Sequence, residues 1–365
     1  MAQNTVLIAG ASGVVGQAAL EHFTNLNDWN VLALSRRRPD VPVGRRYLHL
    51  AVDLRDAEAC WAAMRAVGDV THLIYAALQE KPGLVAGWRD SDQMNTNLAM
   101  LRNLVEPLMA GAPRLRHVSL LQGTKAYGVH LHPIAVPARE RSSRDPHENF
   151  YWLQEDYVRA KSAQGEFAFT IFRPQVIFGD AIGVAMNPTP IIGMYAAICR
   201  EEGRPFAFPG GPSYLLEAVD ARLLARAFAW ATVAPSARNE TFNITNGDVF
   251  VWRNVWPAIA DALGVEPGPD DPFALADFLP KKADVWDRAV SKHRLRPLAM
   301  SDILGESHHY TDFCFAYGAR RDPPPAIVST IKLRQAGFAD CIDTEDMFRH
   351  WFRTLAGKRI LPAII

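Results

Sequence analysis

The sequence predicts an α/β fold in which a doubly wound parallel sheet is joined to a smaller, mainly helical lobe. Two observations support this prediction. In the first half of the chain, short apolar runs alternate with segments of helical periodicity, which is the pattern of βα units joined by right-handed crossovers. After Gly179 the alternation ends, and the chain becomes rich in proline, glycine, methionine and aromatic residues.

The apolar runs and helical patterns can be assigned to elements one by one. The first run, 5–9, ends in glycine and has the composition of a strand that is buried on both faces. The long helix at 95–108 is expected to end near Pro107. We expect strands at 5–9, 31–34, 47–52, 72–75, 115–120, 169–178 and 240–244, and helices at 57–67, 95–108, 150–163, 191–202 and 219–231, after a first helix that ends near residue 26.

A glycine-rich turn follows the first expected strand. Gly10, Gly13 and Gly16 are spaced as G-x-x-G-x-x-G and lead directly into a helix. Glycine allows a tight turn and a close approach of the backbone to a pyrophosphate, and the helix start directs amides and a positive dipole end at the phosphates. This context indicates a Rossmann dinucleotide-binding site, with a purely structural turn as the alternative. The turn residues expected at the cofactor are Gly10, Ser12, Gly13, Val14, Val15 and Gly16.

The chain is therefore expected to contain two domains. Residues 1–179, completed by about 216–250, are predicted to form the dinucleotide-binding Rossmann domain. Residues 180–215 and 251–365 are predicted to form the substrate-binding lobe. Ligands of open α/β sheets bind in a crevice at the carboxyl ends of the strands, so we expect the site at that edge.

The second expected strand ends in a basic segment. An NAD enzyme usually carries an acid there for the ribose 2′-hydroxyl, whereas this chain has Ser35, Arg36 and Arg37. Guanidinium groups offer charge and bidentate hydrogen bonds to a 2′-phosphate, which a carboxylate would repel. We therefore expect NADP(H) as the cofactor, with a solvated basic loop as the alternative.

Further cofactor contacts are expected along the same sheet edge. Asp53, at the end of the third strand, is placed to meet the adenine amine. Ala76 and Ala77 end the fourth strand with small side chains that let the chain pass close to the cofactor. Asn97 either faces the cofactor or is an ordinary helix residue. The remaining expected contacts are Leu54, Pro174, Val176 and Ile177.

The sequence indicates the catalytic residues less directly than the cofactor site. Short-chain dehydrogenases usually carry Y-x-x-x-K, whose lysine lowers the pKa of the tyrosine hydroxyl. The literal match, Tyr157 to Lys161, lies only sixteen residues before Arg173 and leaves little room for the rest of the helix and its loop. We favour Tyr151, at the helix start, with Lys125 from the segment beyond the fifth strand. A plain surface lysine is the alternative for Lys125.

These residues resemble the progesterone 5β-reductase/iridoid synthase-like enone reductases, an atypical branch of the short-chain dehydrogenases. In that family the tyrosine at the helix entry and the lysine of the loop are catalytic, so the resemblance implies these roles for Tyr151 and Lys125. The matching segments, which extend over nearly the whole chain, are the glycine turn, 35–37, 97–103, 121–128, 149–156, 173–179, 195–199 and 242–248.

The resemblance implies NADPH-dependent 1,4-reduction of the activated C=C bond of an enone or enal. This chain differs from the plant members of the family at two positions. Trp152 replaces the second tyrosine of an aromatic pair, and Ala126 replaces a histidine, so steroid or iridoid specificity is not carried over. A carbonyl reductase or nucleotide-sugar epimerase or dehydratase on the same scaffold stays open, as does a non-catalytic NADP-sensing protein.

Composition sets the remaining expectations. The formal net charge is zero, which argues against nucleic acid or an anionic membrane as the main partner. The four cysteines are far apart, so we expect reduced thiols in the cytoplasm. No histidine spacing suggests a metal, and a homodimer stays open. For Met194, Tyr195 and Phe206 two roles stay open, lining the substrate pocket or packing in the core.

Overall fold

The computed structural model describes residues 4–363, which form two compact units. The first unit runs to Gln175 and also contains 221–244 and 328–340. The second contains 176–220, 245–327 and the chain from Cys341. The sequence had assigned 328–340 to the smaller lobe. Lys332 in this segment bonds to Glu240 at 2.7 Å, which fixes it beside the last strand of the sheet.

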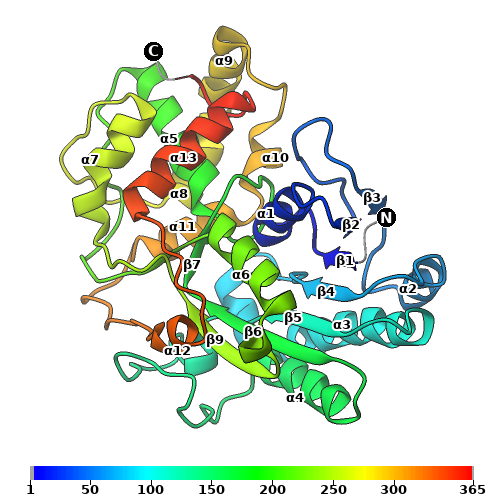
Figure 1. Ribbon diagram of the computed structural model, residues 1–365. Helices are drawn as coiled ribbons and strands as arrows, with labels where there is room; N and C mark the ends of the chain where they lie inside the picture. The colour runs from blue at the N-terminus through cyan, green and yellow to red at the C-terminus, as the bar shows by residue number, and fades with distance from the viewer. Residues whose placement is uncertain (1–3, 364–365) are drawn as a thin grey trace. The chain divides into compact units, whose positions relative to one another are not determined.

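The first unit is built on a seven-stranded sheet in the order β3-β2-β1-β4-β5-β6-β9 (Figure 1). Every pairing is parallel, so the carboxyl ends of the strands share one edge. This confirms the predicted doubly wound sheet. The strands are β1 (Asn4–Ala9), β2 (Trp29–Leu34), β3 (Leu48–Leu50), β4 (His72–Tyr75), β5 (His117–Leu121), β6 (Ala168–Pro174) and β9 (Glu240–Ile244).

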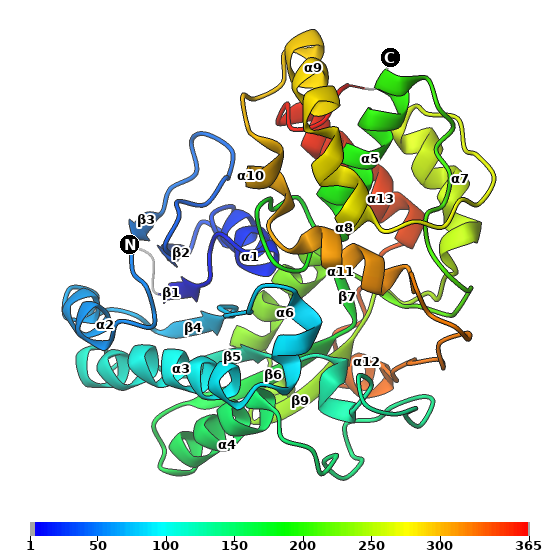
Figure 2. The ribbon, with the colours of Figure 1, turned by 180° about the vertical axis from the view of Figure 1, so that it is seen from behind.

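Helices cover both faces of this sheet. The first helix packs against α6 on one face, while α2, α3 and α4 lie side by side on the other (Figures 1 and 2). Apolar side chains such as Leu73, Leu104 and Ile171 fill the layer beneath α2 to α4. The helices of this unit are α1 (Val14–Phe23), α2 (Ala57–Met64), α3 (Ser91–Gly111), α4 (Phe150–Ala163), α6 (Ala221–Val233) and α12 (Ile331–Gln335), with short 3₁₀ turns η1 (Leu84–Arg89), η2 (Thr124–Tyr127) and η3 (Pro235–Ala237).

The expected end of the long helix near Pro107 is wrong. The helix α3 continues through the proline to Gly111. Proline removes one backbone donor and normally breaks a helix interior. Here Leu104, Leu108 and the proline itself are buried against the sheet, so tertiary packing maintains the last turn.

The single strand expected at 169–178 is two strands. The sheet strand β6 ends at Pro174, and β7 (Val176–Phe178) pairs instead with β8 (Ala218–Asp220) in a separate two-stranded sheet. Pro174 has no amide hydrogen, so it cannot donate to a continuing ladder. The break at Gln175 also separates the first unit from the second.

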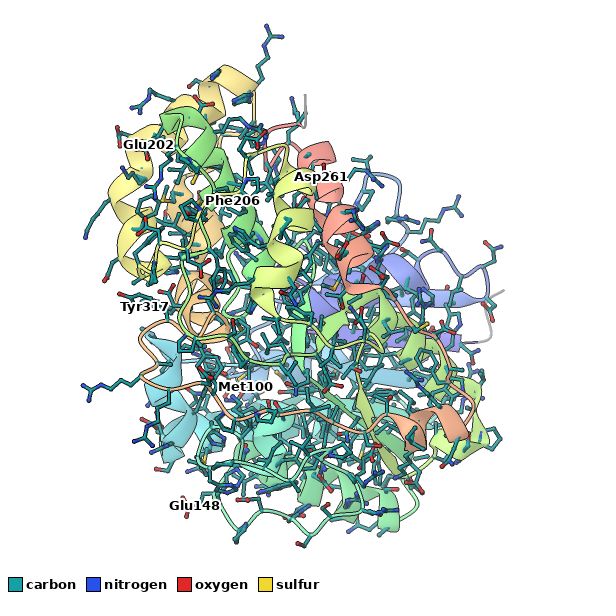
Figure 3. The ribbon with its side chains drawn as sticks, turned by 90° about the vertical axis from the view of Figure 1, so that its left-hand side faces the viewer. Met100, Glu148, Glu202, Phe206, Asp261 and Tyr317 are labelled. Carbon is teal, nitrogen blue, oxygen red and sulfur yellow. The ribbon has the colours of Figure 1, made fainter. Side chains whose placement is uncertain are left out.

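The second unit is mainly helical, as predicted, and its core is rich in aromatic side chains. Phe206, labelled in Figure 3, stacks on Trp256 with ring centroids 4.3 Å apart, and the Tyr195 ring lies tilted against Phe206 at 5.1 Å. Tyr195, Phe206 and Met194 are fully buried, so core packing accounts for all three. The helices are α5 (Pro188–Glu202), α7 (Trp252–Leu263), α8 (Leu275–Phe278), α9 (Ala283–His293), α10 (Met300–Leu304), α11 (Ser307–Cys314) and α13 (Thr344–Gly357), with the 3₁₀ turn η4 (Leu279–Lys282).

Two features bear on the environment of the chain. Among residues 4–363, no helix combines the length and apolar character that crossing a bilayer requires. The four cysteines, Cys60, Cys199, Cys314 and Cys341, are all free thiols.

Candidate functional site

The glycine turn at the end of β1 leaves no space for side chains at two of its glycines. Gly10 has φ of +79°, and a Cβ there would lie 2.7 Å from backbone atoms of Ala76 and Ala77. A Cβ on Gly16 would lie 2.2 Å from the Gly10 carbonyl oxygen, so helix α1 could not approach the turn. Gly13 donates its amide to Gly10 O and caps α1. Ser12 lies in the turn, while Val14 and Val15 begin the helix.

The basic segment after β2 leaves its cations at the surface. Arg36 and Arg37 are exposed, and no ligand is needed to hold the turn that presents them. Ser35 is buried and donates its hydroxyl to the Arg37 carbonyl at 2.6 Å. His49 on β3 lies 3.1 Å from the Ser35 carbonyl oxygen, so the adjacent strand also ties this turn.

Asp53 lies beyond β3, as expected, but already has a partner. Arg55 donates to its carboxylate at 2.6 Å. This hydrogen bond lowers the pKa of Asp53 to about 2, so the carboxylate is charged at neutral pH. Leu54 beside it is buried in the core, with its carbonyl oxygen accepting from Asn103. An adenine amine would therefore share the carboxylate with Arg55.

Asn97 has a structural role in α3. It is fully buried, its Oδ1 accepts from the amide of Gln79, and its Nδ2 donates to the carbonyls of Gln79 and Gln93. These bonds all go to backbone atoms, which favours a role in holding the segment beyond β4. Direct contact with the cofactor stays a prediction.

The other expected cofactor contacts fall in different units. Ala76 and Ala77 lie directly against the glycine turn, and Pro174 ends β6 on the same sheet edge. Val176 and Ile177 belong to β7 in the second unit.

Tyr151 lies in the first turn of α4, which Asn149 caps. The Asn149 Oδ1 accepts from the Tyr151 amide at 3.1 Å, and its Nδ2 donates to the Lys125 carbonyl at 3.3 Å. One side chain thus fixes the backbones of both candidate catalytic residues. The sequence did carry a signal for this role, since asparagine is a preferred N-cap residue.

The Tyr151 side chain is buried, and its hydroxyl lies against Gly123. A Cβ on that glycine would stand 3.2 Å from the Tyr151 Oη. Burial raises the pKa of the phenol well above its usual range, and the charge of Glu80 raises it further. The hydroxyl is therefore protonated at neutral pH and can donate a hydrogen bond.

Lys125 is a buried cation rather than a surface lysine. Its ammonium lies 4.2 Å from the ring centre of Trp88 and 5.8 Å from that of Tyr151. Its nearest carboxylate contact is Glu80 Oε1, at 3.9 Å. Burial lowers the pKa of Lys125 to about 8, and the charge of Glu80 opposes that shift. The plain-surface alternative for Lys125 is wrong, because only 13% of the side chain is exposed.

Glu80 and Trp88 are site residues that sequence reasoning missed. Both lie in the irregular stretch between β4 and α3, where neither periodicity nor a motif marks them. Only the folded chain brings this stretch over η2 and the start of α4.

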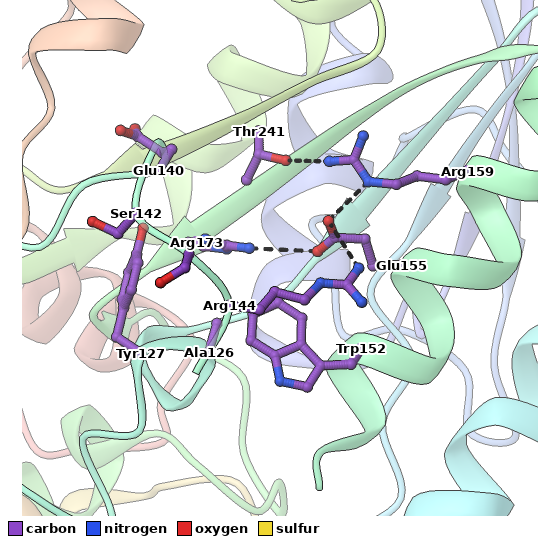
Figure 4. A pocket seen from close by; sticks show the side chains of 11 residues that line it. Ala126, Tyr127, Glu140, Ser142, Arg144, Trp152, Glu155, Arg159, Arg173 and Thr241 are labelled. Atoms are coloured by element: carbon purple, nitrogen blue, oxygen red, sulfur yellow. Dashed lines mark hydrogen bonds and ion pairs between the residues drawn. The ribbon is translucent and has the colours of Figure 1, made fainter. Parts of the chain in front are cut away.

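A polar network around the buried Glu155 carboxylate supports the start of α4, and Figure 4 shows the arginines that contact this carboxylate. Arg173 on β6 donates from Nε to Gln122 Oε1 at 2.7 Å, and Gln122 Nε2 donates to both the Tyr151 carbonyl and Glu155 Oε2. Arg144 and Arg159 also contact Glu155, at 3.3 Å and 2.8 Å. The network therefore joins the ends of β5 and β6 to the helix that carries Tyr151.

The literal Y-x-x-x-K pair serves helix packing. Tyr157 donates its hydroxyl to Glu106 on α3 at 2.8 Å, and Lys161 bonds the same carboxylate at 3.1 Å. Both polar ends thus bond to one carboxylate on the neighbouring helix, Tyr157 by a hydrogen bond and Lys161 by an ion pair.

Within residues 4–363, no group of three or more His, Cys, Asp or Glu side chains is arranged to hold an ion. His308 is buried, and its ring centre lies 4.3 Å from that of His309.

The doubly wound sheet, the glycine turn and the phenol beside an ammonium together define an oxidoreductase of the short-chain dehydrogenase/reductase superfamily that uses a nucleotide cofactor. Residues 58–317 match the family model of the PRISE-like Rossmann-fold domain, which is most of the chain. The chain belongs to this PRISE-like Rossmann-fold family.

Relatives with known activities extend over most of the sequence. The chain is 31% identical to a 3-oxo-Δ(4,5)-steroid 5β-reductase of Arabidopsis thaliana, with 99% of this chain and 94% of the relative covered. It is also 31% identical to an (S)-8-oxocitronellyl enol synthase of Antirrhinum majus, over 82% of this chain and 80% of that one. The family resemblance inferred from the sequence is therefore confirmed.

Solved structures show the same fold at lower identity. UDP-glucose 4-epimerase of Thermotoga maritima superposes with a TM-score of 0.68 at 14% identity, covering 97% of this chain and 99% of that one. The Thermus thermophilus enzyme, solved with NAD, gives 0.66 at 18% identity, with 97% and 99% covered. At such identities the likeness concerns the fold alone.

Proposed function

We propose that this protein is an NADPH-dependent reductase of activated C=C bonds in small enones or enals. The relatives named for a steroid 5β-reductase and an enol synthase support this class of reaction. The observation that carries it is a buried ammonium, Lys125, beside the protonated phenol of Tyr151 at the carboxyl edge of the sheet.

The residues present fit a dinucleotide. Side chains at Gly10 and Gly16 would fill the space where the turn approaches β4 and α1, so the bare backbone forms a cradle for a pyrophosphate. Arg36 and Arg37, exposed after β2, would bind a 2′-phosphate and thereby select NADP(H) over NAD(H). When bound, the nicotinamide supplies a hydride to the β-carbon of the unsaturated substrate.

The chain's own groups act on the substrate's carbonyl oxygen, where negative charge develops as the C=C bond is reduced. The Tyr151 hydroxyl donates a hydrogen bond to this oxygen, and Lys125 contributes a positive charge from a largely buried position. Such preorganised donors stabilise the enolate-like transition state more than the ground state. The α-carbon then takes a proton from solvent.

The alternative activities on this scaffold have less support. An epimerase or carbonyl reductase of the common type would use Y-x-x-x-K, but Tyr157 and Lys161 are both bonded to Glu106. A non-catalytic NADP sensor would not need a buried cation beside a phenol.

The free thiols support a reducing, cytoplasmic location for the reductase.

Steady-state NADPH oxidation tests the proposal with three samples: 2-cyclohexen-1-one, cyclohexanone and no substrate. We expect turnover with the enone only, and mass spectrometry must identify the saturated ketone as the product. Formation of an alcohol from cyclohexanone would instead indicate a carbonyl reductase. A Tyr151→Phe protein that retained the full rate would contradict the proposed role of the phenol.

A further inference from the structure

We propose that Glu80 is a positioning residue that keeps the Lys125 ammonium charged and in place beside Tyr151. This inference rests on the proposed function for its catalytic consequence. The ion pair itself can be tested without any turnover.

The pair is enclosed in an apolar setting. Only 2% of the Glu80 side chain and 13% of the Lys125 side chain are exposed. The ring centres of Trp88, Tyr151 and Phe150 lie 4.2, 5.8 and 5.9 Å from the ammonium. Aromatic faces attract a cation, but they do not replace the hydration that a buried charge loses. A carboxylate 3.9 Å away supplies the missing compensation.

The Glu80 carboxylate is held in place independently of Lys125. Its Oε2 accepts from Gln93 Nε2 at 2.7 Å, and Gln93 Oε1 accepts from the Lys81 amide at 2.8 Å. Asn97 holds the preceding residue, Gln79, through both its amide and its carbonyl. Two side chains of α3 therefore clamp the segment that carries Glu80.

The two oxygens of Glu80 have different environments. Oε2 accepts a hydrogen bond from Gln93, whereas Oε1 is buried, and besides Lys125 the indole of Trp88 also stabilises the Glu80 carboxylate. Oε1 is also the atom nearest the Lys125 ammonium. A buried carboxylate oxygen is costly unless a donor or a cation compensates it, so the position of the ammonium near Oε1 fits a pair in which each charge stabilises the other.

The neighbouring ionisable groups cannot replace Glu80. Burial and the charge of Glu80 both raise the pKa of Tyr151, so the phenol stays neutral. Burial lowers the pKa of His130 to about 4, and the charges of His147, Lys125 and Arg89 lower it further, while Asp145 opposes them. His130 is therefore uncharged at neutral pH. Burial raises the pKa of Glu80 itself, and Lys125 opposes that change.

Glu80→Gln tests the pairing, because it keeps the shape and a hydrogen bond to Gln93 but removes the charge. Pulse labelling with acetic anhydride, followed by peptide mass spectrometry, gives the pH midpoint at which Lys125 becomes reactive. We expect a midpoint near 8 in the natural protein. In Glu80→Gln it should fall by at least about one pH unit. Equal midpoints would overturn the proposal.

Two further variants sharpen this test. Asp90→Asn removes a carboxylate that pairs with Lys81 in the same segment and keeps a good α3 N-cap, so the Lys125 midpoint should not move. Glu80→Asp withdraws the carboxylate by one methylene and should give a midpoint between those of the natural protein and Glu80→Gln. If Glu80→Gln does not fold, a natural midpoint in Glu80→Asp overturns the proposal.

The pH profile of enone reduction supplies the catalytic readout. In Glu80→Gln the alkaline limb of kcat/KM should move down in pH by the same amount as the labelling midpoint, with near-natural activity at low pH. A uniform loss at every pH would indicate a merely structural role. If the midpoint shifts but the natural protein does not reduce enones, the proposed function fails while the ion pair stands.

Discussion

The backbone of Gly123 and the hydroxyl of Tyr151 are so close that a Cβ on the glycine would stand 3.2 Å from the Tyr151 Oη. Gly123 has an extended backbone, with φ of −170°, so conformation does not demand a glycine. The constraint is space: the missing side chain makes room for the phenol at the end of β5.

Gly123→Ala should therefore displace the phenol by a few tenths of an ångström and lower kcat for enone reduction about tenfold, because small misplacements of a catalytic group are costly. The melting temperature should change little. As a control, Gly357→Ala places the same methyl group where nothing lies within 4 Å. An unchanged kcat in Gly123→Ala would show that the Tyr151 hydroxyl is not held at the reacting position.

Asn149 allows helix capping to be separated from site geometry. Asn149→Ala loses the cap of α4 and should cost about 1 kcal/mol of stability. Asn149→Asp keeps an oxygen for the Tyr151 amide but loses the donor to the Lys125 carbonyl. Chemical denaturation should show near-natural stability for the aspartate variant, whereas its kcat should fall together with that of the alanine variant. A fully active Asn149→Asp would argue against a link between the two catalytic segments.

The two tyrosines of α4 give a matched comparison. Tyr157→Phe removes a hydrogen bond to Glu106 and should cost about 1 kcal/mol of stability while leaving kcat intact. Tyr151→Phe removes the proposed oxyanion donor and should lower kcat about 100-fold. Steady-state kinetics and denaturation of both proteins test this pair. The reverse ranking of kcat would assign catalysis to the literal Y-x-x-x-K match.

The Glu155 network predicts a definite dependence of stability on pH. The carboxylate is buried, and hydrogen bonds from Gln122 and Arg159 with the charge of Arg173 outweigh its desolvation and lower its pKa below the usual 4.5. A carboxylate whose pKa is lowered stabilises the folded protein above pH 4.5. That stabilisation is lost as the pH falls through the pKa of Glu155 in the folded protein.

Glu155→Gln should thus destabilise the protein by about 3 kcal/mol at pH 7, because it leaves buried Arg173 without its anion. The difference from the natural protein should shrink as the pH is lowered from 6 to about 3. Urea denaturation across this range measures it. Asp156→Asn, at a side chain that is 61% exposed, is the control and should show little change. A pH-independent difference would contradict the assignment of a charged Glu155.

The basic segment predicts cofactor preference. Replacing Arg36 and Arg37 together by alanine should raise KM for NADPH at least about tenfold, since hydrogen bonds to a charged group are worth about 1.5–3 kcal/mol. KM for NADH should hardly change. Arg65→Ala, at an exposed position after α2, controls for the loss of surface charge. Equal effects on both cofactors would remove the argument for a 2′-phosphate site.

Sequence patterns were sufficient for the parts of the molecule that local rules control. The alternation of apolar runs and helical periodicity located each strand of the seven-stranded sheet to within a few residues. The spacing of Gly10, Gly13 and Gly16 predicted the turn, because at Gly10 and Gly16 a side chain would collide with neighbouring backbone. The position of Tyr151 at a helix start was likewise visible.

Local rules failed where packing between distant segments decides the outcome. Pro107 signals a helix end, but burial of its turn keeps α3 intact to Gly111. The apolar run after Phe169 looks like one strand, yet it divides between two sheets at Gln175. The bonds between Asn97 and Gln79, eighteen residues apart, are likewise formed only in the folded chain.

The sequence by itself determined the parallel sheet, its glycine turn and the family, since each follows from short-range spacing or from the likeness of whole segments. Only the tertiary structure decided the surroundings of Lys125: Glu80 and Trp88 reach it from another segment. The charge state of a buried amine depends on such neighbours and on lost water, which no local pattern records.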